Sequence, residues 1–196
     1  MEAQVKGNTI TIIKSANVEL PRGTIDDGLI TNKEALEVVV QEAIAKSGAS
    51  AKQAVVTINT NSLIIREFEV PNGDPKELEG MINNEIRQYF GISDTDLVEY
   101  RKLSELEVNG VKKVKVRAAV LDRDIASGYY NLLLNLRLKP IALDIHPNAI
   151  SKLFTLRSII NEESLEDKNV ILLDIGYSGS MIYIIAQGQS GFLPLS

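Results

Sequence analysis

The chain has 196 residues, which is enough for one large domain or two small ones. Hydrophobic residues make up 44% of it, so a real core is expected, and a net charge of −5 without a basic run argues against a nucleic-acid or anionic-membrane surface. Cysteine is absent, which excludes disulfides, thiol catalysis and cysteine-based metal sites. There is no signal-peptide pattern and no long apolar run, which predicts a soluble chain.

The first 58 residues alternate strand and helix signals. Two strands are predicted around a short turn, at 2–5 and 9–13, and a third at 53–58. Residues 19–30 hold proline and two glycines, which predicts a structured loop. Thr31 with Glu34 three residues later forms a capping box, so Thr31 is predicted to cap a helix that Gly48 ends.

Residues 62–138 read as a strand-helix-strand-strand-helix block. A strand at 62–70 precedes Asp74 and Pro75, a strong helix start. Asn109-Gly110 is a hairpin signal between strands at 97–103 and 112–121. Asp122 is predicted to cap the last helix. The apolar face of the first helix is predicted to hold Leu78, Met81, Ile82, Ile86, Tyr89 and Phe90.

The last third begins with a predicted strand at 140–145 and a helix at about 149–160, in which His146 is interpreted as a helix-start residue rather than a ligand. An acidic loop at 162–168 follows. The run from Val170 to Leu173 is continuously apolar, which predicts a strand buried on both faces. Two further strands are predicted, at 181–186 and 192–195.

The turn after this apolar run carries the residues that point to chemistry. Glycines let backbone N–H groups approach a phosphate, hydroxyls can donate to its oxygens, and an acid at a strand end can hold Mg²⁺. The same pattern fits a tight β-turn in which the acid hydrogen-bonds its own backbone. The candidate phosphate-binding residues are Asp174, Gly176, Ser178, Gly179 and Ser180, with Asp174 also the candidate metal ligand.

The order of elements resembles the first half of the bacterial actin-like proteins, and more narrowly the PilM family of type IV pilus assembly. The motifs that carry the resemblance are LPRGTIDDGLITNKEAL (20–36), IIREFEVP (64–71), ELEGMINNEIRQYF (77–90), YYNLLLNLRLKPIALDI (129–145) and VILLDIGYSGS (170–180). The resemblance implies an α/β (α+β) chain with an actin-like ATPase, ribonuclease H-like subdomain. It also implies an inserted SHS2-type strand-helix-strand-strand-helix module.

The resemblance further implies a division of the chain. Residues 1–61 and 139–167 would form the discontinuous subdomain 1A, residues 62–138 the inserted subdomain 1C, and residues 168–196 the start of subdomain 2A. The first strand of subdomain 1A would be missing, which would leave an open edge beside the hairpin of residues 1–13. We expect the strands at the C-terminal end to cover that edge, in the same chain or in a neighbour, so a homo-oligomer is possible.

The intact family binds ATP with Mg²⁺, and Asp174, Gly176 and Ser180 match its second phosphate motif. Its first phosphate motif and its adenosine motif have no counterpart in this sequence. A buried triphosphate needs donors on both sides of a cleft. We therefore expect this chain neither to bind ATP tightly nor to hydrolyse it, and no catalytic residue is assigned.

The family is a cytoplasmic scaffold at the inner face of the membrane that binds the N-terminal peptide of PilN, in a groove between the inserted module and the main subdomain. The residues expected to contact the peptide are Ile64, Arg66, Phe68, Ile141 and Leu143. Two other readings share the architecture, an FtsA-like cell-division protein and a GspL-type secretion platform protein. A third reading is a nucleotide-dependent phosphotransferase.

Overall fold

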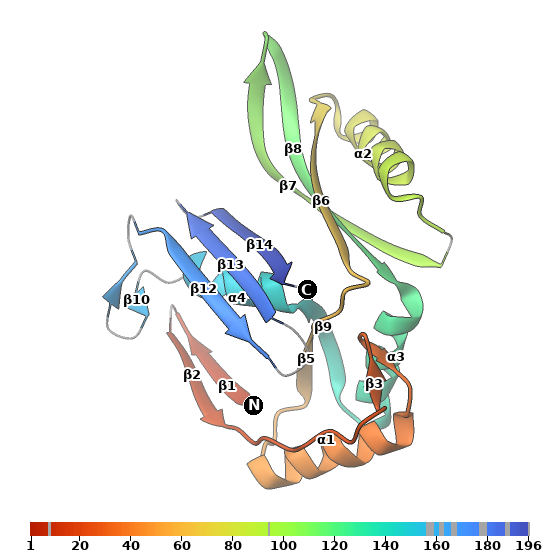
Figure 1. Cartoon of the computed structure of the whole chain (residues 1–196), viewed down its shortest axis with the longest axis vertical. Helices are drawn as coiled ribbons and strands as arrows, with labels where there is room; N and C mark the ends of the chain where they lie inside the picture. The colour runs from red at the N-terminus through yellow and green to blue at the C-terminus, as the bar shows by residue number, and fades with distance from the viewer. Residues whose placement is uncertain are drawn as a thin grey trace. The chain divides into compact units, whose positions relative to one another are not determined.

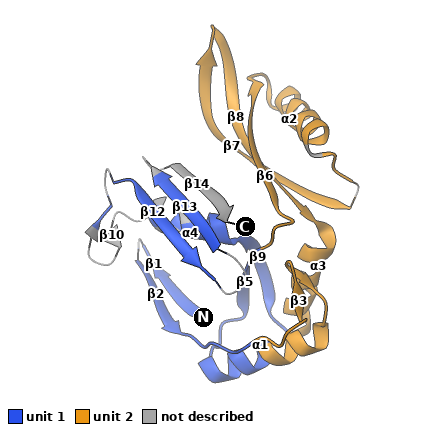
Figure 2. Cartoon of the chain, viewed as in Figure 1, with its two compact units in different colours: residues 1–19, 40–59, 137–196 blue, residues 20–39, 60–136 orange. Residues whose placement is uncertain are grey.

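The computed structural model describes residues 1–7, 9–93, 95–155, 159–160, 163–165, 168–176, 180–186 and 189–195 (Figure 1). The chain forms two compact units. Unit 1 comprises residues 1–19, 40–59 and 137–196, and unit 2 comprises residues 20–39 and 60–136 (Figure 2). The block predicted at 62–138 lies almost wholly in unit 2, which also includes residues 20–39. The assignment of these parts to named subdomains stays a prediction.

Unit 1 contains several small sheets and one helix of its own. The hairpin β1–β2 is antiparallel and β5 pairs in parallel with β9, while β12, β13 and β14 form an antiparallel sheet in that order. Helix α4 contacts β9, β13 and β14. The bounds are β1 Glu2–Lys6, β2 Thr9–Lys14, β5 Gln53–Ile58, β9 Lys139–Ile145, α4 His146–Thr155, β10 Ile159–Ile160, β11 Glu163–Ser164, β12 Val170–Ile175, β13 Ser180–Ala186 and β14 Gln189–Leu195.

The β1–β2 hairpin is tied to the segment that follows helix α1 (Lys33–Ser47). The Glu2 carboxylate accepts hydrogen bonds from the N–H groups of Ser50 and Ala51, at 2.5 and 3.1 Å, and these bonds lower its pKa. The Lys14 ammonium donates to the carbonyl of Gly48. The open end of the hairpin, where Glu2 pairs with Lys14, is therefore held at the entry to β5.

Helix α4 begins earlier and ends earlier than the sequence pattern predicts. It starts at His146, as the interpretation of that residue requires. The Asp144 carboxylate accepts from its neighbour Ile145 N–H at 2.9 Å and from the Asn148 amide at 2.7 Å. Prediction of a helix through residue 160 was wrong, since Ile159–Ile160 pairs with β11 as a short strand.

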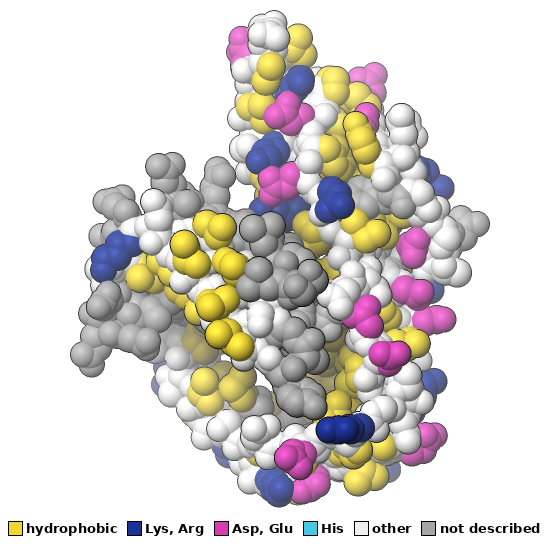
Figure 3. Space-filling model, viewed as in Figure 1, with side chains coloured by type: hydrophobic (Ala, Val, Ile, Leu, Met, Phe, Trp, Pro, Cys, Tyr) yellow, Lys and Arg dark blue, Asp and Glu magenta, His cyan; other side chains and the backbone are white. Residues whose placement is uncertain are grey.

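Strand β12 is not buried on both faces, so that prediction was also wrong. Val170, Leu172, Tyr183 and Ile185 share the face on which α4 packs, and Tyr183 and Ile185 are buried there. On the opposite face, three side chains of β12 remain open to solvent, and hydrophobic side chains gather on this surface in Figure 3. The exposed fractions are 72% for Ile171, 51% for Leu173 and 75% for Ile175. No described element covers them.

Unit 2 is built around a three-stranded antiparallel sheet in the order β6-β8-β7, with α2 packed on one face. The core between helix and sheet contains Val70, Leu78, Ile82, Ile86, Val114, Val116, Ala118 and Val120. Tyr89, predicted inside, is 71% exposed, and the side chain of Phe90 lies outside the described residues. The bounds are β6 Ile64–Pro71, α2 Pro75–Phe90, β7 Asp96–Val108 and β8 Val111–Asp122.

The rest of unit 2 is a short hairpin and a helix. Strands β3 (Ile25–Asp26) and β4 (Leu29–Ile30) pair across a two-residue turn, and α3 (Arg123–Asn135) packs on β4. The packing is close, because a Cβ added at Gly128 would lie 3.3 Å from Ile30 Cδ1. The loop predicted at 19–30 is therefore an ordered hairpin anchored on α3.

Three helix caps test the sequence reading directly. Asp74 accepts from the N–H groups of Lys76 and Glu77, and Asp122 accepts from that of Asp124, so both predicted caps are confirmed. The cap of α1 is not Thr31. The side-chain oxygen of Asn32 accepts a hydrogen bond from Ala35 N–H at 3.0 Å. The Thr31 hydroxyl instead donates to the Gly23 carbonyl at 2.7 Å.

Candidate functional site

The candidate phosphate turn connects β12 to β13. Asp174 and Ile175 end β12, Gly176 follows, and Ser180 opens β13. Ser178 and Gly179 lie outside the described residues. Asp174 and Gly176 are exposed and Ser180 is half-buried. Two strands therefore hold both ends of the turn at a solvent-exposed edge of unit 1.

Strand register separates the side chains of Asp174 and Ser180. Asp174 pairs with Met181, whereas Ser180 pairs with Ile175. Paired residues point to the same face of an antiparallel sheet and neighbours along a strand to opposite faces. Asp174 therefore extends to the face on which α4 packs and Ser180 to the opposite face. The carboxylate and this hydroxyl do not converge on one ligand.

Next to Asp174 on the α4 face lies an unsatisfied phenol. Tyr183 is buried, with 2% of its surface exposed, and its hydroxyl has no hydrogen-bond partner among the described residues. Two effects raise the pKa of Tyr183: burial is the larger, and the negative charge of Asp174 is the smaller. The phenol stays neutral at physiological pH and is available only as a hydrogen-bond donor or weak acceptor.

Asp174 is the candidate cation ligand among the described residues of this turn. Among them, no three acidic or histidine side chains come together in a group that could hold a metal ion. Mg²⁺ is commonly held through one or two carboxylates together with phosphate oxygens. Asp174 would supply one such carboxylate, so the described residues of the turn fit Mg²⁺ only in part.

The expected peptide-contact residues of unit 2 lie on strand β6. Ile64, Arg66 and Phe68 share one face of the sheet, the face that α2 covers further along. Phe68 is half-buried against the α2 core, so its ring is largely committed to packing. Ile64 is 38% exposed at the start of the strand. Arg66 is exposed and donates to the Ile65 carbonyl at 3.0 Å.

The other two expected contact residues lie on β9 in unit 1. Ile141 is 51% exposed, beside a register shift in the pairing of β5 with β9. Leu143 is half-buried and pairs with Val56. Of the five residues, Ile64 and Ile141 are the large apolar side chains with more than a third of their surface exposed.

Sequence reasoning missed one polar cluster. The Asp27 carboxylate accepts from Asn61 N–H and from the Ser62 hydroxyl, each at 2.7 Å, and its main-chain carbonyl accepts from the Thr60 hydroxyl at 2.7 Å. Partial burial raises the pKa of Asp27, but the bonds from Asn61 and Ser62 outweigh it and hold that pKa below its ordinary value. The Asp-Gly dipeptide signals the turn itself, whereas nothing local signals its distant partner.

Comparison with known proteins identifies the fold and the family. The sequence matches the family model described as "Type IV pilus assembly protein PilM" over residues 1–193. The structure resembles a solved structure titled "PilM-PilN type IV pilus biogenesis complex", with a TM-score of 0.80 and 22% sequence identity. This likeness covers 98% of the chain described here and 57% of the matched chain. No curated protein matches the chain.

The fold is therefore mixed α/β and belongs to the actin-like ATPase class. The family match extends over nearly the whole sequence. The chain belongs to the PilM family of type IV pilus assembly proteins. Among the described residues, no helix has both the length and the apolar character needed to cross a membrane.

Proposed function

We propose that this chain acts in type IV pilus assembly as a cytoplasmic scaffold that binds the N-terminal peptide of a PilN-type membrane protein. The observation that carries the proposal is the likeness to the PilM–PilN complex, which extends over 98% of the chain. The family match favours this role over the FtsA-like, GspL-type and phosphotransferase alternatives. Through such a partner the chain would sit at the inner face of the membrane.

We assign the peptide contacts to Ile64, Arg66 and Phe68 on β6 and to Ile141 and Leu143 on β9. Ile64 in unit 2 and Ile141 in unit 1 support the assignment, because each is a large apolar side chain with more than a third of its surface open. Arg66 adds a guanidinium that can hydrogen-bond a peptide carbonyl or carboxylate. Phe68 and Leu143 would contribute mainly by supporting their strands. Peptide recognition of this kind uses apolar anchors together with main-chain hydrogen bonds.

The test is calorimetric titration of the full chain with a synthetic peptide of the PilN N-terminal segment. Binding is expected for the unaltered chain and is expected to weaken strongly in I64D and I141D. V111D is the matched control, since Val111 is 50% exposed but lies at the start of β8 beside the hairpin turn. Absence of binding to the unaltered chain would reject the proposal.

Nucleotide binding is tested separately with Mg-ATP. We expect no tight binding, because the Asp174 and Ser180 side chains extend to opposite faces of their sheet. A single exposed turn leaves most of the triphosphate charge in water, where charge interactions are weak. Tight ATP binding without peptide binding would move the phosphotransferase alternative to the front.

A further inference from the structure

In the turn between β3 and β4, the Asp27 side chain accepts hydrogen bonds from a distant segment of the chain. Asp27 and Gly28 both have positive φ, 41° and 85°, as a two-residue type I′ turn requires. Asp tolerates this region better than most residues with a side chain. An aspartate in a turn commonly hydrogen-bonds its own backbone. Here the carboxylate instead reaches residues more than thirty positions further along the chain.

The segment that the carboxylate holds is the entry to β6. Thr60, Asn61 and Ser62 precede the strand, which begins at Ile64. Asp27 engages all three, through Asn61 N–H, the Ser62 hydroxyl and the Thr60 hydroxyl. Gly28 adds a steric contact, because a Cβ at this position would lie 2.8 Å from Thr60 Cβ. The turn and the segment therefore fit closely as well as hydrogen-bond.

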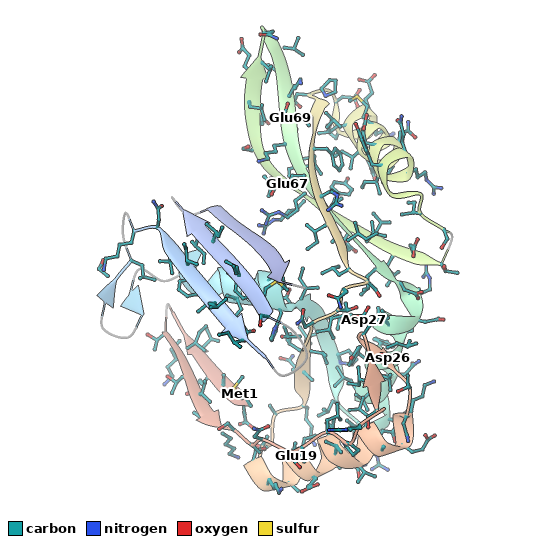
Figure 4. All side chains as sticks on the ribbon, in the orientation of Figure 1. Met1, Glu19, Asp26, Asp27, Glu67 and Glu69 are labelled. Carbon is teal, nitrogen blue, oxygen red and sulfur yellow. The ribbon has the colours of Figure 1, made fainter. Side chains whose placement is uncertain are left out.

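The hairpin that carries Asp27 is itself held in place. Ile30 of β4 is buried and packs against Gly128 of α3. The Thr31 hydroxyl and N–H bond back to the carbonyls of Gly23 and Thr24, which closes the loop behind the hairpin. Asp27 thus ties residues 60–62, which lead into β6, to a hairpin that is itself packed on α3. Figure 4 shows Asp26 and Asp27 as neighbours on this hairpin.

We infer that Asp27 is a positioning residue, which fixes the entry to β6 and thereby the orientation in which Ile64 is presented to the peptide. The inference rests on the proposed function, in which Ile64 contacts a PilN-type peptide. It adds a residue that touches no peptide itself. Asp26 gives the matched control, because it is the same residue type, adjacent in the hairpin and exposed, and within the described part of the chain its side chain makes no hydrogen bond to residues 60–62.

The first measurement is amide hydrogen exchange of the full chain without peptide. In D27A, the rate of amide exchange at Asn61, Ser62 and the first residues of β6 is expected to rise by about tenfold. This is the factor that corresponds to the loss of one hydrogen bond to a charged group, taken at the lower end of the usual range of its free energy. D26A should leave these amides unchanged. D27N should restore most of the protection, because its amide oxygen still accepts from Asn61 N–H and asparagine tolerates the turn. Unchanged exchange at Ile64 and Ile65 in D27A would overturn the inference.

The second measurement is calorimetric titration of the same variants with the PilN peptide. D27A is expected to bind about fivefold to tenfold more weakly than the unaltered chain, and D27N and D26A to bind nearly as tightly. N32A, which removes a helix cap elsewhere in unit 2, tests whether mere loss of stability lowers affinity. Equal affinity of D27A and the unaltered chain would overturn the inference while leaving the proposed function intact. No binding by the unaltered chain would reject the proposed function, and the exchange data alone would then decide whether Asp27 holds the strand entry.

Discussion

Glu67 on β6 and Arg117 on β8 face each other across the sheet of unit 2, and Glu67 Oε1 accepts from both Nε and Nη2 of Arg117, at 2.8 and 2.5 Å. Lys115 pairs with the other carboxylate oxygen at 2.7 Å. Figure 4 marks Glu67 on the sheet, and Figure 3 shows acidic and basic side chains interleaved over the same sheet. Burial raises the pKa of Glu67, but the bonds from Lys115 and Arg117 outweigh it and hold that pKa below its ordinary value.

This pairing predicts a pH dependence of stability. Because the folded-state pKa of Glu67 is lowered, its contribution is complete above the unfolded-state pKa and is lost as pH falls through the folded-state pKa. E67Q should unfold with a free energy lower by roughly 0.2–1 kcal/mol at pH 7 and by less at pH 3. Urea denaturation at both pH values measures this. E69Q is the control, since among the described residues Glu69 has a single ion-pair partner, Lys113 at 3.2 Å. An equal loss at both pH values in E67Q would contradict the account.

The cap of helix α1 gives a second prediction. N32A removes the acceptor for Ala35 N–H and should lower the free energy of unfolding by about 1 kcal/mol. E34A should cost much less, because the capping box that would have used Glu34 is not formed around Thr31. T31V removes the Thr31–Gly23 bond and should loosen the 23–31 loop without fraying the helix. Denaturation measures the first two effects and amide exchange in α1 the third. Faster α1 exchange in T31V than in N32A would restore Thr31 as the cap.

These elements also indicate how far sequence reasoning reaches. Asp74 and Asn109-Gly110 were read correctly because their signals are local: a cap acts within one turn, and Asn109 and Gly110 both adopt the positive φ, 53° and 77°, that their turn demands. The order of strands and helices was also predicted from local signals. Thr31 and Asn32 are both good cap residues, so local preference alone could not choose between them. The choice is made by the Gly23 carbonyl, eight residues away.

Features that depend on contacts between distant parts of the chain could not be predicted from local sequence patterns. The apolar pattern of β12 predicts burial, yet burial depends on which other elements lie against each face, and α4 packs on one face only. The opposite directions of Asp174 and Ser180 depend on pairing register, which the turn sequence does not reveal. The bonds of Asp27 to residues 61 and 62 join segments whose approach is decided by the whole of unit 2.

A glycine pair separates backbone strain from steric contact. Gly23 and Gly28 have positive φ, 73° and 85°, but a Cβ at Gly23 meets nothing within 4 Å, whereas one at Gly28 lies 2.8 Å from Thr60 Cβ. G23A should therefore cost about 1–2 kcal/mol from backbone conformation alone. G28A should cost a further 1–3 kcal/mol, because the backbone or Thr60 must move. Urea denaturation measures both. Equal costs would mean that the Thr60 contact relaxes freely, and would weaken the case for a closely fitted turn.

An isoleucine pair on neighbouring strands tests the exposed face of β12. Ile171 is 72% exposed and Ile185 is 5% exposed, on opposite faces of the same sheet. I185A should lower the free energy of unfolding by about 2–5 kcal/mol, because it leaves a cavity beneath α4. I171A should change it by less than about 0.5 kcal/mol, as surface substitutions do. Denaturation at two protein concentrations measures both. A cost above about 1 kcal/mol for I171A that grows with concentration would mean that another copy of the chain covers this face in solution, since association stabilises the folded state by mass action.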